Sequence, residues 1–256
     1  MRYRYPRTLL SLGGYTTPAV KGLIIANVAV FLVQFFAGLF YPPLAAALLK
    51  LFGLIPYAVT HGLRIWQPFT YLFLHGGFWH IVLNMFVLWM FGCDLERSWG
   101  RRRFLFYYFL TGVGAGVLNV AVKTIAASGV LTVTIGASGA IFGLLLAFGL
   151  LFPDRIIYLY FLIPIPARIF VLIIGALTFY ASLSSAGDNI SHISHLGGML
   201  FGLIYLRGRR WFGLSNWTYR IRLAYWDWKR RRLRKQFEVY MRDHDSEERR
   251  HDRWVH

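Results

Sequence analysis

The feature that most constrains this chain is a series of long apolar stretches almost free of charged residues. A helix of roughly 18 such residues can cross a hydrocarbon core about 30 Å thick. Of the 256 residues, 57% are hydrophobic and only 15% are charged, whereas soluble domains average about 25% charged residues. The sequence therefore predicts an all-α, polytopic membrane protein and excludes an ordinary soluble enzyme or a disordered chain. We predict six spans, at 23–40, 78–93, 104–122, 137–152, 167–183 and 190–206.

Two proline-containing segments separate these spans. The pair Pro42–Pro43 follows the first span and cannot continue a helix. The segment 156–166 contains Ile-Pro-Ile-Pro and is too short and too broken to cross a membrane, so we expect a loop or an interfacial segment there. The basic start of the chain resembles a signal peptide, but the apolar run that follows is too long, which favours an uncleaved first helix.

The basic residues are distributed unevenly about the predicted spans. With six spans, one face receives Arg2, Arg4, Arg7, Lys21, Arg97, Arg101 to Arg103, Arg155, Arg168 and the tail, whereas the other face receives Lys50, Arg64 and Lys123. Loops rich in Lys and Arg stay in the cytoplasm. We therefore predict both termini in the cytoplasm, with a cytoplasmic segment at 1–22, a six-helix domain at 23–206 and a basic cytoplasmic tail at 207–256.

Thirteen of the 28 Lys and Arg precede residue 207, so the tail carries the other 15. Its stretch Trp226–Lys235 combines a run of four basic residues with nearby tryptophans, which predicts an amphipathic segment on anionic lipid. Nucleic acid is not an expected partner. The single cysteine, Cys93, allows no internal disulfide.

Four polar side chains inside the predicted spans lie at similar depth. Polar groups are costly in hydrocarbon and need a partner or a function. From the helical rise and the nearest charge on each span, Asn84 lies ~15 Å, His195 ~18 Å, His80 ~21 Å and Ser138 ~24 Å from the cytoplasmic face. A hydroxyl, two imidazoles and an amide from three helices therefore share one layer, which indicates a common site.

Small residues indicate which helices approach each other. Gly139 and Gly143 on the fourth span, and Gly198 and Gly202 on the sixth, form small-xxx-small pairs that allow close backbone contact. His195 lies on the same helical stripe as the second pair. Close contact of these helices would bring Ser138 within hydrogen-bond reach of His195, as a nucleophile and base require. The alternative is that Ser138 bonds a backbone carbonyl and the glycines only pack.

His80 and Asn84 are four residues apart and share one face of the second span. Both can donate hydrogen bonds, so together they predict an oxyanion hole beside Ser138; the alternative is a pair of interhelical hydrogen bonds. No carboxylate is placed to orient His195, because Asp188 lies seven residues away. We therefore predict a Ser-His dyad, with the ring of Phe142 stacking on the imidazole.

Three motifs carry a family resemblance. They are His75-Gly-Gly-Phe-Trp-His80-Ile-Val-Leu-Asn84, Gly136-Ala-Ser138-Gly139-Ala-Ile-Phe-Gly143 and Ser191-His-Ile-Ser-His195-Leu-Gly-Gly198. In order and spacing, on spans two, four and six, they resemble the signatures of rhomboid intramembrane serine proteases over about residues 66–206. The resemblance implies a six-helix core with Ser138 as nucleophile, His195 as general base, and His80, Asn84 and the Ser138 amide as oxyanion donors.

The resemblance also implies that Gly136 lets a substrate backbone approach, and that no metal, nucleotide or other cofactor is required. Two positions differ from some family members. Gln67 follows Trp66 where those members have Arg, so we expect the anchoring role of that Arg to be absent. Phe142 stands where others have Tyr, which retains a stacking ring without its hydroxyl. The other imidazole nearby, His192, lies outside the His-Leu-Gly-Gly pattern.

The resemblance implies substrates that are single-span membrane proteins, cut in or beside the span. Helix-weak sequences are expected to be preferred, because a helical peptide bond is shielded until it unwinds. We expect an integral protein of a prokaryotic cytoplasmic membrane. Two alternatives remain: a metal enzyme or transporter that uses His75, His80, His192 and His195, and a non-catalytic rhomboid-like chaperone that binds spans without cutting them.

Overall fold

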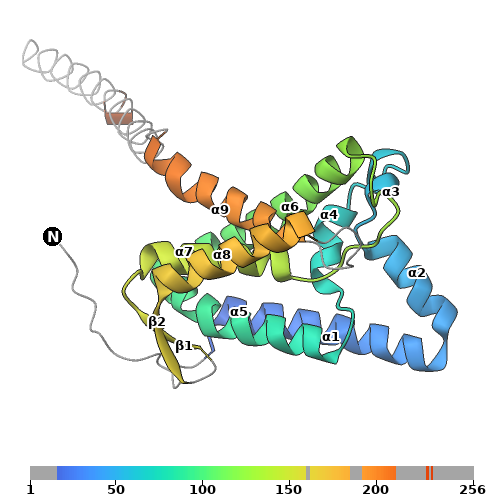
Figure 1. Cartoon of the computed structure of the whole chain (residues 1–256), viewed down its shortest axis with the longest axis horizontal. Helices are drawn as coiled ribbons and strands as arrows, with labels where there is room; N and C mark the ends of the chain where they lie inside the picture. Colours follow the sequence, from blue (N-terminus) through green and yellow to red (C-terminus); the bar gives the residue numbers. More distant parts are fainter. Residues whose placement is uncertain (1–15, 160–161, 185–191, 212–228, 231, 233–256) are drawn as a thin grey trace, which may run out of the picture. The chain divides into compact units, whose positions relative to one another are not determined.

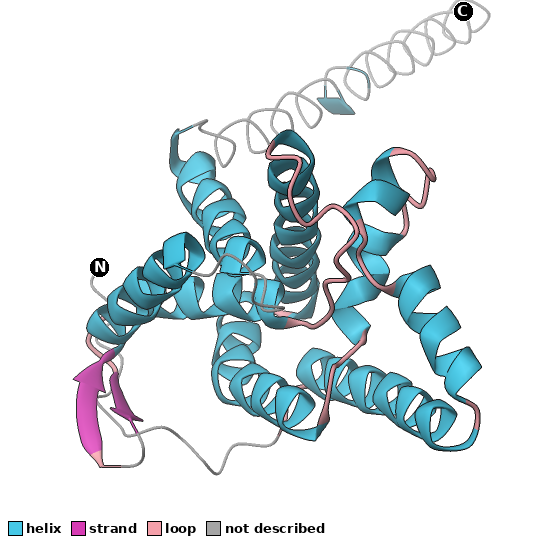
Figure 2. Cartoon of the chain, turned by 45° about the vertical axis from the view of Figure 1, so that its right-hand side comes forward, coloured by secondary structure: helices cyan, strands magenta, loops and turns pink. Residues whose placement is uncertain are grey.

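The structure is a computed structural model that describes residues 16–159, 162–184, 192–211, 229–230 and 232 (Figure 1). The chain divides into two units, 1–206 and 207–256. The described part of the first unit consists of helices and one short hairpin (Figure 2). The elements are α1 (Pro18–Phe40), α2 (Pro42–Phe52), α3 (Pro56–Thr60), α4 (Gln67–Thr70), η1 (Tyr71–Phe73), α5 (Phe78–Trp99), α6 (Arg101–Ile125), α7 (Ser138–Leu151), β1 (Ile156–Leu159), β2 (Ile163–Pro166), α8 (Ala167–Ser184) and α9 (His192–Trp211).

Each of the six predicted spans falls largely on one helix: α1, α5, α6, α7, α8 or α9. Among the described residues, α1, α5 and α6 are long and apolar enough to cross a membrane, while Ser138–Leu151 and Ala167–Tyr180 are shorter apolar helices. Residues 190–191 of the sixth predicted span lie outside the described residues. The helical membrane architecture is thus confirmed, and the count of six spans stays a prediction.

The segment 156–166, predicted to be a loop or an interfacial segment, contains a short β-hairpin. There β1 and β2 pair antiparallel, with Ile157 opposite Ile165 and Tyr158 opposite Pro164. Proline is tolerated in a strand when its nitrogen faces away from the ladder, as it can in a two-stranded ribbon. The Ile-Pro-Ile-Pro segment therefore forms an edge strand where a loop was expected.

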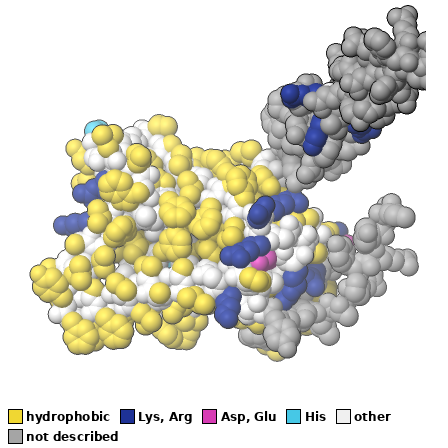
Figure 3. All heavy atoms as spheres, turned by 180° about the vertical axis from the view of Figure 1, so that it is seen from behind, with side chains coloured by type: hydrophobic (Ala, Val, Ile, Leu, Met, Phe, Trp, Pro, Cys, Tyr) yellow, Lys and Arg dark blue, Asp and Glu magenta, His cyan; other side chains and the backbone are white. Residues whose placement is uncertain are grey.

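The surface of the first unit is mainly apolar. In the view of Figure 3, hydrophobic side chains cover most of the described face, and Lys and Arg gather toward its ends. Phe36, Phe40 and Trp79 are among the large hydrophobic residues that are at least half exposed. Such exposure fits helices whose surroundings are hydrocarbon.

In the tail, Lys229, Arg230 and Arg232 are the described residues of the predicted amphipathic segment at 226–235; the rest of that segment lies outside the described residues.

A buried carboxylate fixes the start of α1. Glu96, near the end of α5, is 5% exposed and accepts hydrogen bonds from the backbone N–H groups of Ala19 and Val20 at 2.9 to 3.1 Å. Those donors have no partner within their own helix, and a negative charge at a helix N-terminus is favourable. Pro18 supplies the fixed φ of the first turn. The helix therefore begins five residues earlier than predicted, and Lys21 lies inside it.

Gln67, at the position where the anchoring role of an Arg was expected to be absent, anchors the loop that follows α1 through its own hydrogen bonds. Its side chain is fully buried; Oε1 accepts the Ile55 N–H at 3.0 Å, and Nε2 donates to the Lys50 carbonyl at 3.0 Å. The Leu51 carbonyl accepts from the Trp66 indole, and the Phe52 carbonyl from the Thr70 hydroxyl. Side chains of 66–70 thus satisfy carbonyls that the end of α2 leaves without helical partners.

Replacing Gln67 with Met is expected to lower the free energy of unfolding by about 1–3 kcal/mol, because the partly buried Ile55 N–H loses its partner. Thermal unfolding in micelles measures the change. Trp66→Phe serves as the matched control, since it removes one hydrogen bond from a residue that is 43% exposed. Equal melting temperatures for Gln67→Met and wild type would contradict the anchoring role.

Candidate functional site

The first feature of the site is a direct contact between Ser138 and His195. The Ser138 Oγ lies 2.8 Å from His195 Nε2, a hydrogen bond across 57 residues of sequence. Ser138 is the first residue of α7, and His195 lies in the first turn of α9. Both side chains are only partly buried, so a reacting group can reach them. An imidazole nitrogen at this distance can accept the proton of a hydroxyl nucleophile.

Close packing of α7 and α9 produces this contact. A Cβ on Gly198 would overlap the carbonyl oxygen of Gly139, so the two backbones touch one residue after Ser138 and three residues after His195. The predicted approach of these helices is confirmed at this pair. Farther along the stripe the nearest atoms belong to α6: Gly143 lies against Thr111 and Gly202 against Tyr107, with Leu146 of α7 also next to Gly202. The glycines therefore allow α7 and α9 to pack closely on α6 as well as on each other.

An aromatic ring orients the imidazole. The rings of Phe142 and His195 are stacked, with centroids 4.2 Å apart and planes 4° from parallel, which confirms the predicted contact. Phe142 lies one turn after Ser138 on α7, so the same helix holds both partners of His195. Within the described residues, no hydrogen bond joins His195 to a carboxylate, and Asp188 lies outside them.

Substituting Phe142 with Leu is expected to lower kcat about three- to tenfold, because ring stacking contributes on the order of 0.5–1.5 kcal/mol. Phe142→Tyr keeps the ring and is the matched control, expected to stay within about twofold of wild type. Steady-state kinetics on a membrane-embedded reporter gives the comparison. The stacking argument fails if the Leu and Tyr variants lose activity equally.

His80 and Asn84 direct donors toward Gly136. A Cβ built on Gly136 would lie 2.8 Å from His80 Nε2 and 3.9 Å from Asn84 Nδ2. The Gly76 N–H donates to His80 Nδ1 at 3.3 Å, which places the proton of the neutral ring on Nε2, facing Gly136. Asn84 is 7% exposed, and its Nδ2 has no hydrogen-bond partner. Two donors therefore converge on one point, as an oxyanion hole requires.

The backbone around Gly136 is held by a framework that sequence reasoning missed. Its φ of +117° is strained for any residue with a side chain. The Gly136 N–H donates to the Tyr71 carbonyl, and the buried Tyr71 hydroxyl donates to the Gly112 carbonyl at 2.7 Å. Two residues earlier, Thr134 forms an isolated β-bridge with Leu54. No sequence motif marks Tyr71 or Thr134, because their role depends on contacts between distant segments.

His192 and His75 do not take part in the contact between Ser138 and His195. The His192 ring lies 6.0 Å from that of His195 and meets it edge-on, and His75 similarly meets His80 at 5.1 Å. Burial, and then the neighbouring His80, lowers the pKa of His75 to about 4, so its ring is neutral at pH 7. Within the described ranges, no three His, Cys, Asp or Glu side chains form a group that could hold a metal ion.

The sequence of the chain also matches a known protein family. A model of the rhomboid domain matches residues 62–211, more than half of the chain. The chain belongs to the rhomboid family. The matched region includes all five predicted site residues and extends from the segment before α4 to the end of α9. A rhomboid domain is a helical membrane bundle, as the fold indicates.

Several curated proteins are similar to this rhomboid chain. Rhomboid protein 1, mitochondrial, from Saccharomyces cerevisiae is 31% identical over 134 residues, which is 52% of this chain and 38% of that protein. Rhomboid-like protease 5 of Toxoplasma gondii is 34% identical over 64% of this chain and 20% of its own length. Putative rhomboid protease YdcA of Bacillus subtilis is 32% identical over 54% of this chain and 64% of its own length. The match thus covers less than two thirds of each of these relatives.

Proposed function

We propose that this rhomboid chain is an intramembrane serine endopeptidase that cleaves single-span membrane proteins in or next to their span. Ser138 is the nucleophile and His195 the general base. The observation that carries the proposal is the 2.8 Å contact between Ser138 Oγ and His195 Nε2, with two donors beside it. Relatives whose names describe rhomboid proteases support the same activity.

In the proposed reaction, Ser138 Oγ attacks the carbonyl carbon of the scissile bond while its proton passes to His195 Nε2. The carbonyl oxygen becomes an oxyanion that His80 Nε2, Asn84 Nδ2 and the Ser138 amide stabilise; that amide lies at the N-terminus of α7, where helical N–H groups have no partners. His195 returns the proton to the leaving nitrogen as the bond to carbon breaks. Water, deprotonated by His195, then releases the acyl group.

Gly136 contributes space in this scheme. Because it has no Cβ, the region between its backbone and the two donors stays open for a substrate carbonyl. Substrate chains with small residues and weak helical propensity suit such a site, since the scissile bond has to unwind before its carbonyl is free. No cofactor has a role in these steps.

We also propose six spans with both termini cytoplasmic, organised as 1–22, 23–206 and 207–256, with the tail on anionic lipid. The uneven distribution of Lys and Arg supports the orientation. Relatives include mitochondrial proteins of yeast and Arabidopsis as well as proteins of Bacillus subtilis. They support an integral membrane location, and they do not favour a prokaryotic cytoplasmic membrane over a mitochondrial one.

The deciding experiment is mass spectrometry of the products formed when the purified chain is incubated with single-span proteins in liposomes. We expect a cut in or next to the span with wild type and none with Ser138→Ala. Bound but uncut spans would indicate a non-catalytic, chaperone-like rhomboid. Cleavage that persists in Ser138→Ala and disappears with a chelator would overturn the serine mechanism in favour of a metal site.

A further inference from the structure

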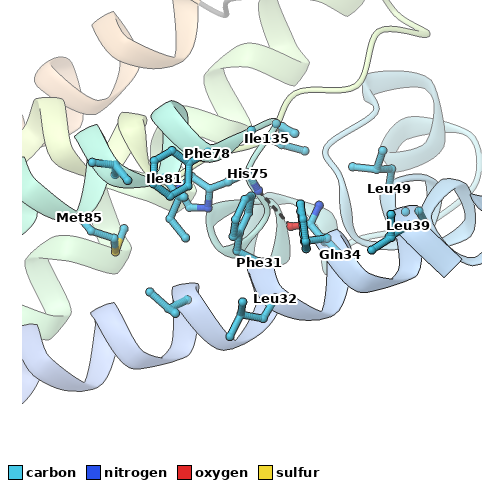
Figure 4. Close-up of a pocket in the computed structure, with 17 residues that line it drawn as sticks. Phe31, Leu32, Gln34, Leu39, Leu49, His75, Phe78, Ile81, Met85 and Ile135 are labelled. Atoms are coloured by element: carbon cyan, nitrogen blue, oxygen red, sulfur yellow. Dashed lines mark hydrogen bonds between the residues drawn. The ribbon is translucent and has the colours of Figure 1, made fainter.

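A cavity lies on the side of α5 that faces α1. It has a volume of about 870 Å³ and is lined by α1, α2, α5, the segment that joins η1 to α5, and Ile135 (Figure 4). Phe31 and Leu32 from α1, Leu49 from α2, and Phe78 and Met85 from α5 are among its lining residues. Ser138, His195 and Phe142 are not among them, so the cavity is separate from the candidate catalytic contact.

The chemistry of the lining selects an uncharged, apolar occupant. Among the described residues, no Lys, Arg, Asp or Glu lines the cavity. Its polar side chains are Gln34 and His75, and the Gln34 Oε1 already accepts the His75 backbone N–H at 3.1 Å (Figure 4). Lining residues such as Leu32 and Phe35 are 45% and 54% exposed, so the cavity opens beside the lipid-facing surface of α1.

The length of the cavity suits a hydrocarbon chain. On α1 the lining runs from Val28 to Leu39, about 16.5 Å of helix, close to the ~15 Å depth of one leaflet. The cavity is therefore long enough for an acyl chain that reaches through one leaflet.

Two cations, Lys50 and Arg64, lie near the part of the cavity that α2 lines. Leu49 lines it, and the next residue, Lys50, is exposed. The Arg64 guanidinium, which is half-buried, donates to the Lys50 carbonyl at 2.6 Å, so a second cation lies near the same place. An apolar groove of leaflet length with two cations at one end matches a phospholipid, whose phosphate follows its acyl chains.

We propose that this cavity is a binding site for a phospholipid, with the acyl chains between α1 and α5 and the phosphate near Lys50 and Arg64. The bound lipid contacts the segment between η1 and α5. This segment contains Gly76, whose N–H donates to His80. A bound lipid therefore touches the backbone that holds one of the proposed oxyanion donors. Binding itself does not depend on the proposed proteolytic activity.

Two glycines of α1 provide a matched test. Gly38 lines the cavity, whereas Gly22 does not, and a Cβ at either position meets no atom within 4 Å. Gly38→Phe fills the groove without a clash in the protein, and Gly22→Phe adds the same ring to the same helix elsewhere. Gly38→Ile is a smaller substitute if the first variant folds poorly.

The measurement is native mass spectrometry of the full chain after detergent exchange and titration with phosphatidylglycerol. We expect wild type and Gly22→Phe to retain phospholipid, and Gly38→Phe to bind it about tenfold more weakly. A phosphatidylglycerol carrying a diazirine in mid-chain should label α1 at 28–39 and α5 at 78–85 in wild type. Equal retention by the two Phe variants, or cross-linking of a single-span peptide in place of lipid at these residues, would overturn the proposal.

Discussion

Replacement of Ser138 by Ala is expected to abolish cleavage, lowering kcat by roughly 10⁴-fold or more, because no other group takes the place of a lost nucleophile. The same substitution should abolish covalent labelling by a fluorophosphonate. In that reaction Ser138 Oγ forms a bond to phosphorus, fluoride leaves, and the hydroxyl proton passes to His195. The 2.8 Å contact between the two residues is the basis for both expectations.

Substitutions of the two neighbouring histidines make this test specific. His195→Ala should suppress labelling and cleavage nearly as strongly as Ser138→Ala. His192→Ala should leave most of the activity, since the His192 ring lies 6.0 Å from that of His195 and is absent from the contact with Ser138. Tandem mass spectrometry of the labelled chain identifies the modified residue. Labelling that survives in Ser138→Ala would refute Ser138 as the nucleophile.

The Gly198→Ala variant is expected to lose both stability and activity. Its new Cβ would overlap the Gly139 carbonyl oxygen, a backbone atom that cannot rotate away. Overpacking of this kind costs about 1–3 kcal/mol or more. Moving α9 away from α7 also lengthens the distance between Ser138 Oγ and His195 Nε2, so kcat should fall at least about a hundredfold even where the protein stays folded.

Gly175→Ala is the matched control for this variant. Gly175 also packs against α9, but its Cβ would meet the terminal methyl group of Met199 at 3.3 Å, which can move at little cost. Thermal unfolding in micelles and steady-state kinetics should therefore separate the two alanine variants. If Gly198→Ala matches Gly175→Ala in both measurements, close contact of α7 and α9 is not what sets the geometry of the site.

Sequence predicted the part of the site that depends on helical periodicity. The uncharged stretches identified the principal helices, and the spacing of Gly198 from His195 predicted the contact with Gly139 that brings Ser138 to the imidazole. The stacking of Phe142 followed from its position one turn after Ser138. These predictions succeeded because residues three or four apart on a helix share a face whatever the rest of the fold.

What sequence did not predict depends on contacts between distant segments. Gln67 has its role because its side chain forms hydrogen bonds with Lys50 at the end of α2 and with Ile55 just beyond it. The type of residue at position 67 does not reveal these partners. The early start of α1 results from a carboxylate 76 to 77 residues away. Gly143 and Gly202 lie against Thr111 and Tyr107 of α6, and periodicity alone does not say which neighbour a stripe faces.

The hydrogen bonds from the start of α1 to Glu96 join α1 and α5 at one end. Near that end Val20 packs close to Gly92, whereas farther along the same two helices line the cavity between them. A bilayer of different thickness changes the tilt of its spans. With one end fixed, such a tilt acts on the other end, where Gln34 of α1 accepts the His75 N–H in the segment that also contacts His80. We therefore expect the thickness of the bilayer to affect the position of this proposed oxyanion donor.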